Sequence, residues 1–154
     1  MYSTLIFLHS LFRWLVLSSL VYAIFRAYRG LRSGSPFANA DNAIRHWTAT
    51  IAHVQLMIGC LLYFTSPVIK QLFGNFTGAT SYKEPAFFGV IHLSLMLAAI
   101  IVITIGSALA KRKTADRDKF RTMLLWFSVA LIIIFIAIPW PFSPFANRPL
   151  IRSF

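Results

Sequence analysis

The sequence predicts an all-α membrane protein, an up-down-up-down bundle of four transmembrane helices with both termini outside. Hydrophobic residues make up 58% of the 154 residues and charged residues only 12%, about half the charged share of a typical soluble domain. Four apolar runs are each about 17–25 residues long, the length that a helix needs to cross the hydrocarbon core. The length suits a single domain, residues 1–154.

The first helix is expected at about 4–25. This run has no charged segment before it and no small-residue cleavage site after it, so we interpret it as a retained helix and not as a signal peptide. The polar segment that follows contains Gly30, Gly34 and Pro36, which we expect to break the helix.

The second helix is expected at about 44–65, with Asp41 or Asn42 as its cap and a stop at Ser66-Pro67. The stretch VIKQLFGNFTGATSYKE then has two glycines and mixed polarity. We expect it to be a loop.

The third helix is expected at about 85–110, with Pro85 in its first turn. The fourth is expected at about 122–138 and ends at Pro139. The proline-rich tail after it is not expected to be helical.

The basic residues predict the topology. The two connections after the first and third helices, together with Arg45 at the start of the second helix, contain ten lysines and arginines, whereas the remaining connection and the tail contain four: Lys70, Lys83, Arg148 and Arg152. Cytoplasmic loops are the ones enriched in basic residues, so both termini are predicted outside. The net charge of +11 therefore indicates topology and anionic lipid, not nucleic acid. Short connections make the first and third helices diagonal neighbours, and likewise the second and fourth.

The polar residues inside the spans are the candidates for function, because ionisable groups are costly at membrane depth. They are few: His9, Arg13, His46, His53, Gln55 and His92. Each histidine has an alternative role as a hydrogen-bonding partner of a neighbouring helix. His46, beside Trp47 near the inner boundary, is interpreted as interfacial.

Depth separates these histidines. His9 and His92 are expected ~7–11 Å below the outer boundary on diagonal helices. Two facing imidazoles at one depth are what a bis-histidine haem needs. His53 is expected ~20 Å deep, and its diagonal helix contains no histidine. His53 with His92 is therefore the second choice for the iron ligands, and it requires the third helix to begin before Pro85 or to be displaced inward.

Arg13 lies one turn from His9 on the same face, and all four acidic residues lie outside the expected spans. Its guanidinium must extend to the interface, bind backbone carbonyls, or bind an anion such as a haem propionate. Gly89, Ala99 and Gly106 share a helix stripe with His92. These small residues indicate either room for a macrocycle or close packing of helices.

Other chemistry has weaker support. Gln55 and Tyr63 are candidates for a quinone pocket or for contacts between helices. No nucleophile–base set, phosphate loop or HExxH motif is present, and the single cysteine, Cys60, allows neither an internal disulfide nor a CxxCH haem attachment. Three histidines also suit copper or zinc, but His53 is expected too deep to join the other two.

Four segments carry a resemblance to a known family: LHSLFRWLVL, AHVQLMIGCLLYFTSP, FGVIHLSLMLAAIIVITIGS and the closing IPWPF. In this order, over nearly the whole chain, they resemble a family of small bacterial four-helix membrane proteins commonly labelled cytochrome b. His9, Arg13, Trp14, His53 and His92 match its motif positions. His46 does not match a motif position. Members of the family often have a histidine in the basic loop, at the position of Phe120 or one of its neighbours, and this chain has none there. Its absence counts against a shared role of that histidine.

The resemblance implies haem b and electron transfer. The leading hypothesis is a haem carrier in a bacterial cytoplasmic membrane, with His9 and His92 as ligands, Arg13 at a propionate, and a quinone and a larger redox complex as its partners. His53 would then be an outer-sphere group or a quinone or proton ligand. The alternative is a haem-free accessory subunit of a larger membrane complex. A third hypothesis is a small quinone-reactive oxidoreductase that uses His53 and Gln55.

Overall fold

The computed structural model describes residues 1–74, 83–143, 146, 148 and 149, and their regular structure is entirely helical. This confirms the all-α class. The described elements are α1 (Tyr2–Ser33), α2 (Asn39–Thr65), α3 (Pro67–Gly74), α5 (Lys83–Ala86), the π-helical turn η1 (Phe87–Ile91), α6 (His92–Arg112) and α7 (Asp116–Ala137).

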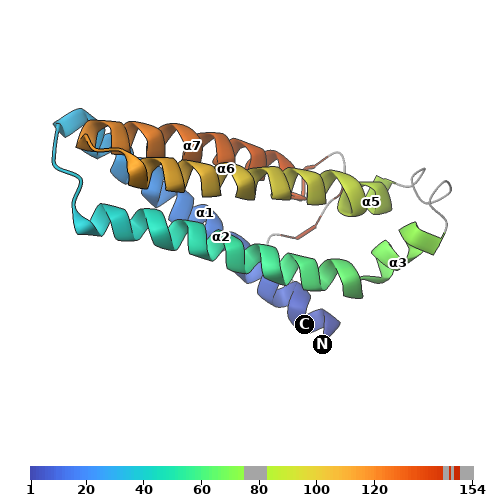
Figure 1. Cartoon of the computed structure of the whole chain (residues 1–154). Coiled ribbons are helices and arrows are strands. Elements are labelled where there is room, and N and C mark those ends of the chain that lie inside the picture. Colours follow the sequence, from blue (N-terminus) through green and yellow to red (C-terminus); the bar gives the residue numbers. More distant parts are fainter. Residues whose placement is uncertain (75–82, 144–145, 147, 150–154) are drawn as a thin grey trace.

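The long helices form the predicted four-helix bundle (Figure 1). Helix α1 packs against α2 and α7, and α6 packs against the same two helices, so α1 and α6 are diagonal. The α1–α2 and α6–α7 connections lie at one end of the bundle, and the N-terminus lies at the other. Four helices, with α5, η1 and α6 forming one of them, are long and apolar enough to cross a membrane, which makes this a multi-pass membrane protein.

Helix α1 continues to Ser33, so the expected end near residue 25 was wrong. Gly30 does not break the helix. Gly30 is helical and buried, and a β-carbon there would collide with the ring of Phe120. Gly30 therefore allows a close approach of α7 to α1. The helix ends at Gly34, whose φ of 64° is the left-handed conformation that glycine adopts most easily.

Helix α2 begins before either of its expected caps. Asp41 lies in the first turn, where its carboxylate accepts the backbone N–H of Ala38 at 3.1 Å and the guanidinium of Arg26 at 2.7 Å. Asn42 accepts two hydrogen bonds from Arg45. Both residues thus stabilise the start of the helix, but from positions inside it.

Helix α2 ends at Thr65, as expected. The following stretch was expected to be a loop, but its first part is helical. Pro67 begins α3, and a proline suits the first turn of a helix. Ile69 and Leu72 are the buried residues of α3. The rest of the expected loop, 75–82, lies outside the described residues.

The third spanning helix begins at Lys83, two residues before its expected start, and the fourth begins at Asp116 in place of about 122. The third helix also ends later than predicted, at Arg112, so both helices extend further into the basic connection between them. Helices continue through polar turns beyond the hydrocarbon core. The described part of the tail is not helical, as expected.

The core is packed most closely in the half of the bundle near the basic connections. Its members are apolar side chains with almost no exposure, namely Leu20, Ala23, Ala27, Ile103, Ala110, Phe120, Met123 and Phe127. The other half contains a cavity.

Candidate functional site

A cavity of about 220 Å³ lies among α1, α2, α3, η1, α6 and the end of α7, in the half of the bundle that holds the N-terminus. Most of its wall is apolar. The polar and charged side chains that line it are Tyr2, His9, Ser10, Arg13, Gln55, Cys60, Tyr63, Ser66, His92 and Arg148.

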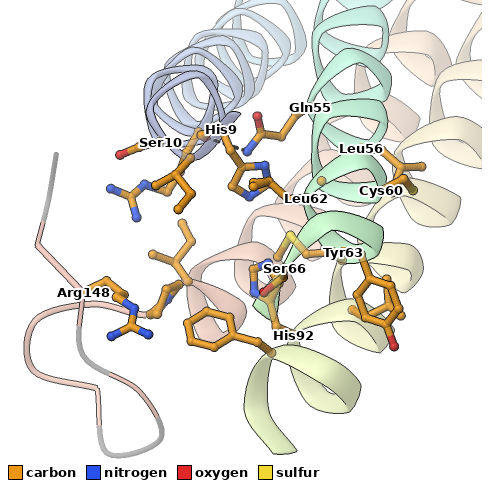
Figure 2. A pocket seen from close by; sticks show the side chains of 18 of the residues that line it. His9, Ser10, Gln55, Leu56, Cys60, Leu62, Tyr63, Ser66, His92 and Arg148 are labelled. Carbon is orange, nitrogen blue, oxygen red and sulfur yellow. Dashed lines mark hydrogen bonds between the residues drawn. The ribbon is translucent and has the colours of Figure 1, made fainter. Parts of the chain in front are cut away.

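His9 and His92 reach this cavity from diagonal helices, α1 and α6. Both rings project into the same space (Figure 2). Their centroids are 6.4 Å apart, and their planes are inclined at 68°. The two histidines expected at one depth are therefore brought together.

The ring of His92 is held in a defined orientation. Its Nδ1 lies 2.8 Å from the backbone oxygen of Ala137 at the end of α7. Because a carbonyl only accepts hydrogen bonds, Nδ1 carries the proton and Nε2 keeps its lone pair. Phe87 and Phe88 pack around the ring, with centroids 5.8 and 6.1 Å away. His92 thus presents one basic nitrogen to the cavity.

The backbone before His92 is a π-helical turn, in which the N–H of His92 bonds to the carbonyl of Phe87. The turn is buttressed from two sides. The hydroxyl of Tyr63 donates to the carbonyl of Gly89 at 3.0 Å, and a β-carbon at Gly89 would collide with Leu72 of α3. Single π-turns in helices are often found at functional sites, and this one ends at the candidate ligand.

His9 has a different environment. A β-carbon on Gly59 would lie 3.3 Å from Cε1 of the ring, so the glycine leaves space for the imidazole. The amide nitrogen of Gln55 donates to the backbone oxygen of His9 at 3.0 Å. Within the described part of the chain, Nδ1 of His9 and Oε1 of Gln55 are both buried and have no hydrogen-bond partner.

Two arginines give the cavity a positive edge. Arg13 lines it one turn along α1 from His9, with its guanidinium carbon 5.5 Å from the ring centroid of Trp14. Arg148 lines it from the tail and makes two 2.9 Å hydrogen bonds to the carboxylate of Glu84. The sequence singled out Arg13, but nothing in it pointed to Arg148, because contacts of a non-helical tail have no periodic signal.

His53 is not part of this cavity. Its ring lies in an exposed position, where Nδ1 bonds to the carbonyl of Ala49 at 2.7 Å and Nε2 lies 3.1 Å from the hydroxyl of Thr104. The third helix does begin before Pro85, yet His53 and His92 are not brought together. His46 is exposed beside Trp47, with ring centroids 5.9 Å apart.

The stripe of small residues on the His92 helix has mixed roles. Ala99 lines the cavity. Gly89 faces Leu72, and a β-carbon at Gly106 would collide with Trp126 of α7. At the two glycines the stripe therefore serves close packing, and only the alanine borders the cavity.

The donor set is two imidazoles. No cluster of three or more histidine, cysteine or acidic side chains capable of holding a metal ion occurs among the described residues. Two facing imidazoles suit an axial pair, in which a cofactor supplies the remaining ligands. Sequence reasoning missed the Ala137 carbonyl and Gly59, because a backbone acceptor and a missing side chain carry no signal before the helices are packed.

Comparison with known proteins yields no match: no family model, no curated protein and no solved structure matches this chain.

Proposed function

We propose that this protein is a b-type haem electron carrier of a bacterial cytoplasmic membrane, in which His9 and His92 would hold one haem through its iron. The observation that carries the proposal is the convergence of these two imidazoles, from diagonal helices, at a centroid separation of 6.4 Å on one cavity. The resemblance of four sequence segments to small cytochrome b-like proteins points in the same direction.

The separation fits a shared iron. A metal–imidazole nitrogen bond is about 2 Å long and the nitrogen lies about 1 Å from the ring centre, so two axial imidazoles have centroids about 6 Å apart. The 68° between the rings is compatible with this arrangement, because each ring can rotate about the axis through the metal.

The surroundings fit as well. A metal-ligating histidine usually donates its other ring N–H to a carbonyl or carboxylate, and His92 does so to Ala137. Arg13 would hold a propionate, since a guanidinium binds a carboxylate in a bidentate manner. The apolar wall of the cavity would exclude water from the macrocycle.

Haem b supplies reversible one-electron transfer, and ligation by both histidines leaves no open position for a substrate. The residues here would therefore bind and orient the group without a bond-making role. Such a carrier would pass electrons between a quinol, for which Gln55 and Tyr63 offer polar contacts at the same cavity, and a larger membrane redox complex.

A haem-free accessory subunit is the second candidate, and one observation favours it. Several polar side chains link the helices to each other: Gln55 links α2 to α1, and His53 and Thr104 link α2 to α6. Such bonds are common between membrane helices, and a subunit that only stabilises a larger complex would need nothing more.

The deciding experiment is a reduced-minus-oxidised absorption spectrum of the full chain purified in detergent. We expect a reducible Soret band and an α band, and we expect His92→Ala and His9→Ala each to abolish them by removing an axial ligand. His46→Ala is the matched control, because this imidazole is exposed and away from the cavity; its spectrum should equal that of the parent. A colourless, iron-free preparation would contradict the proposal and support the accessory subunit.

A further inference from the structure

We propose that Gln55 is the positioning residue for His9, with its side-chain oxygen accepting the Nδ1–H of the imidazole when His9 binds the iron. This inference rests on the proposed function and adds a residue to it. Gln55 would do for His9 what the Ala137 carbonyl does for His92.

The first observation is a pair of buried polar atoms. Nδ1 of His9 and Oε1 of Gln55 both lie out of contact with solvent, and neither has a hydrogen-bond partner among the described residues. A buried polar atom without a hydrogen-bond partner is costly, so both atoms need an explanation. One can donate and the other can only accept, so they are complementary.

The second observation is that Gln55 is already attached to His9. Its amide nitrogen donates to the backbone oxygen of His9 at 3.0 Å. This bond keeps the amide of α2 beside the residue whose ring needs an acceptor. Gln55 also lines the same cavity as His9.

The third observation is the room to complete the bond. The Cε1 and Nδ1 side of the His9 ring faces Gly59, where even a β-carbon would lie 3.3 and 3.7 Å from these two atoms. With only a hydrogen on the glycine, no side chain of residue 59 occupies the Nδ1 side of the ring.

The consequence is a matched pair of ligands. With Nδ1 protonated and bonded to an oxygen on each ring, Nε2 is the nitrogen that faces the cavity in both. A hydrogen bond of this kind sets the tautomer and raises the basicity of the ligand. A more basic ligand stabilises the oxidised iron, so the bond should lower the midpoint potential.

The test compares Gln55→Leu, Gln55→Glu and Gln71→Leu in the detergent-purified full chain, by haem titration and by redox potentiometry. Gln71 is exposed on α3, so Q71L is the same chemical change away from the cavity and should match the parent. For Q55L we expect haem binding weakened by about 10–100-fold and a raised midpoint potential. Q55E keeps an oxygen acceptor for Nδ1–H but loses the amide donor to the His9 carbonyl, so its affinity should lie between those of Q55L and the parent, with a potential no higher than the parent's.

The outcomes separate this inference from the proposed function. If the parent binds haem and Q55L has the parent's affinity and potential, or if Q55E is as impaired as Q55L, then Gln55 only links helices and the inference is wrong while the haem proposal stands. If the parent binds no haem, both are wrong. Should Q55L fail to fold, Q55E alone decides, since an altered affinity with a raised potential would overturn the assignment.

Discussion

Buried polar atoms set most of the chemistry available in the half of the bundle that holds the N-terminus. Each of the two cavity histidines contacts residues of another helix. For His92 this is the carbonyl of Ala137 in α7, and for His9 these are Gly59 and Gln55 of α2. Because these contacts come from distant parts of the chain, a substitution there should act on a ligand that it does not replace.

Tyr63→Phe is a test at the residue level. The change removes the hydroxyl that donates to the carbonyl of Gly89 and leaves that carbonyl without this partner, at a cost of about 1–3 kcal/mol. We expect a lower thermal midpoint in detergent and faster hydrogen exchange of the amides in η1 and at His92.

The control for this prediction is Tyr28→Phe. Tyr28 is 49% exposed at the other end of α1, so loss of its hydroxyl should change neither quantity. Unchanged exchange at His92 in the Tyr63 variant would show that the hydroxyl does not hold the π-turn.

Among the elements, the close contacts of the helices depend on glycines. Gly30 admits the ring of Phe120, Gly89 admits Leu72, and Gly106 admits Trp126. In lipid, association of helices relies on close packing of this kind, because the surrounding chains are as apolar as the helix surfaces. Each glycine therefore determines how near two particular elements lie.

Gly106→Ala tests this at the level of the helix pair. The added methyl would collide with Cβ of Trp126, close to the α7 backbone where little adjustment is available. We expect α6 and α7 to be pushed apart at a cost of about 1–3 kcal/mol, measured as a lower thermal midpoint.

Gly74→Ala is its matched control. No atom of the described residues lies within 4 Å of the added methyl at the end of α3, so the midpoint should stay the same or rise slightly, because alanine has the higher helix propensity. Equal midpoints for the two variants would mean that the α6–α7 contact yields without cost.

At the scale of the whole molecule, the topology remains a prediction. The basic connections share one end of the bundle, and the positive-inside rule assigns that end to the cytoplasm. After replacement of Cys60 by alanine, a single cysteine introduced at Ser35 or at Ser143 reports on which side of the membrane that end of the bundle lies.

We expect a membrane-impermeant maleimide to label Ser143→Cys in intact spheroplasts, and Ser35→Cys only after permeabilisation. The parent with Cys60→Ala is the unlabelled control. The reverse pattern would place the cavity near the cytoplasmic face and would change the side from which electrons enter.

The sequence by itself determined the class, the number of spanning helices and their order around the bundle. These follow from lengths of apolar runs and from short connections, which are local properties. It also placed His9 and His92 at one depth, because depth depends only on the count of residues from a helix end. It missed the π-turn, the helix α3 and the helical positions of Gly30 and Asp41, since each depends on contacts with another element.

Only the tertiary structure decided which way the side chains face. His53 lies in a membrane span like the cavity histidines, yet its ring is exposed on the outside of the bundle, where it contacts the Ala49 carbonyl and the Thr104 hydroxyl. The rotation of a helix about its axis is set by packing against its neighbours, and so are the partners of each buried atom. The sequence could therefore rank His9 and His92 as the first pair by depth, whereas only the packed bundle brought Gln55, Gly59 and the Ala137 carbonyl to them.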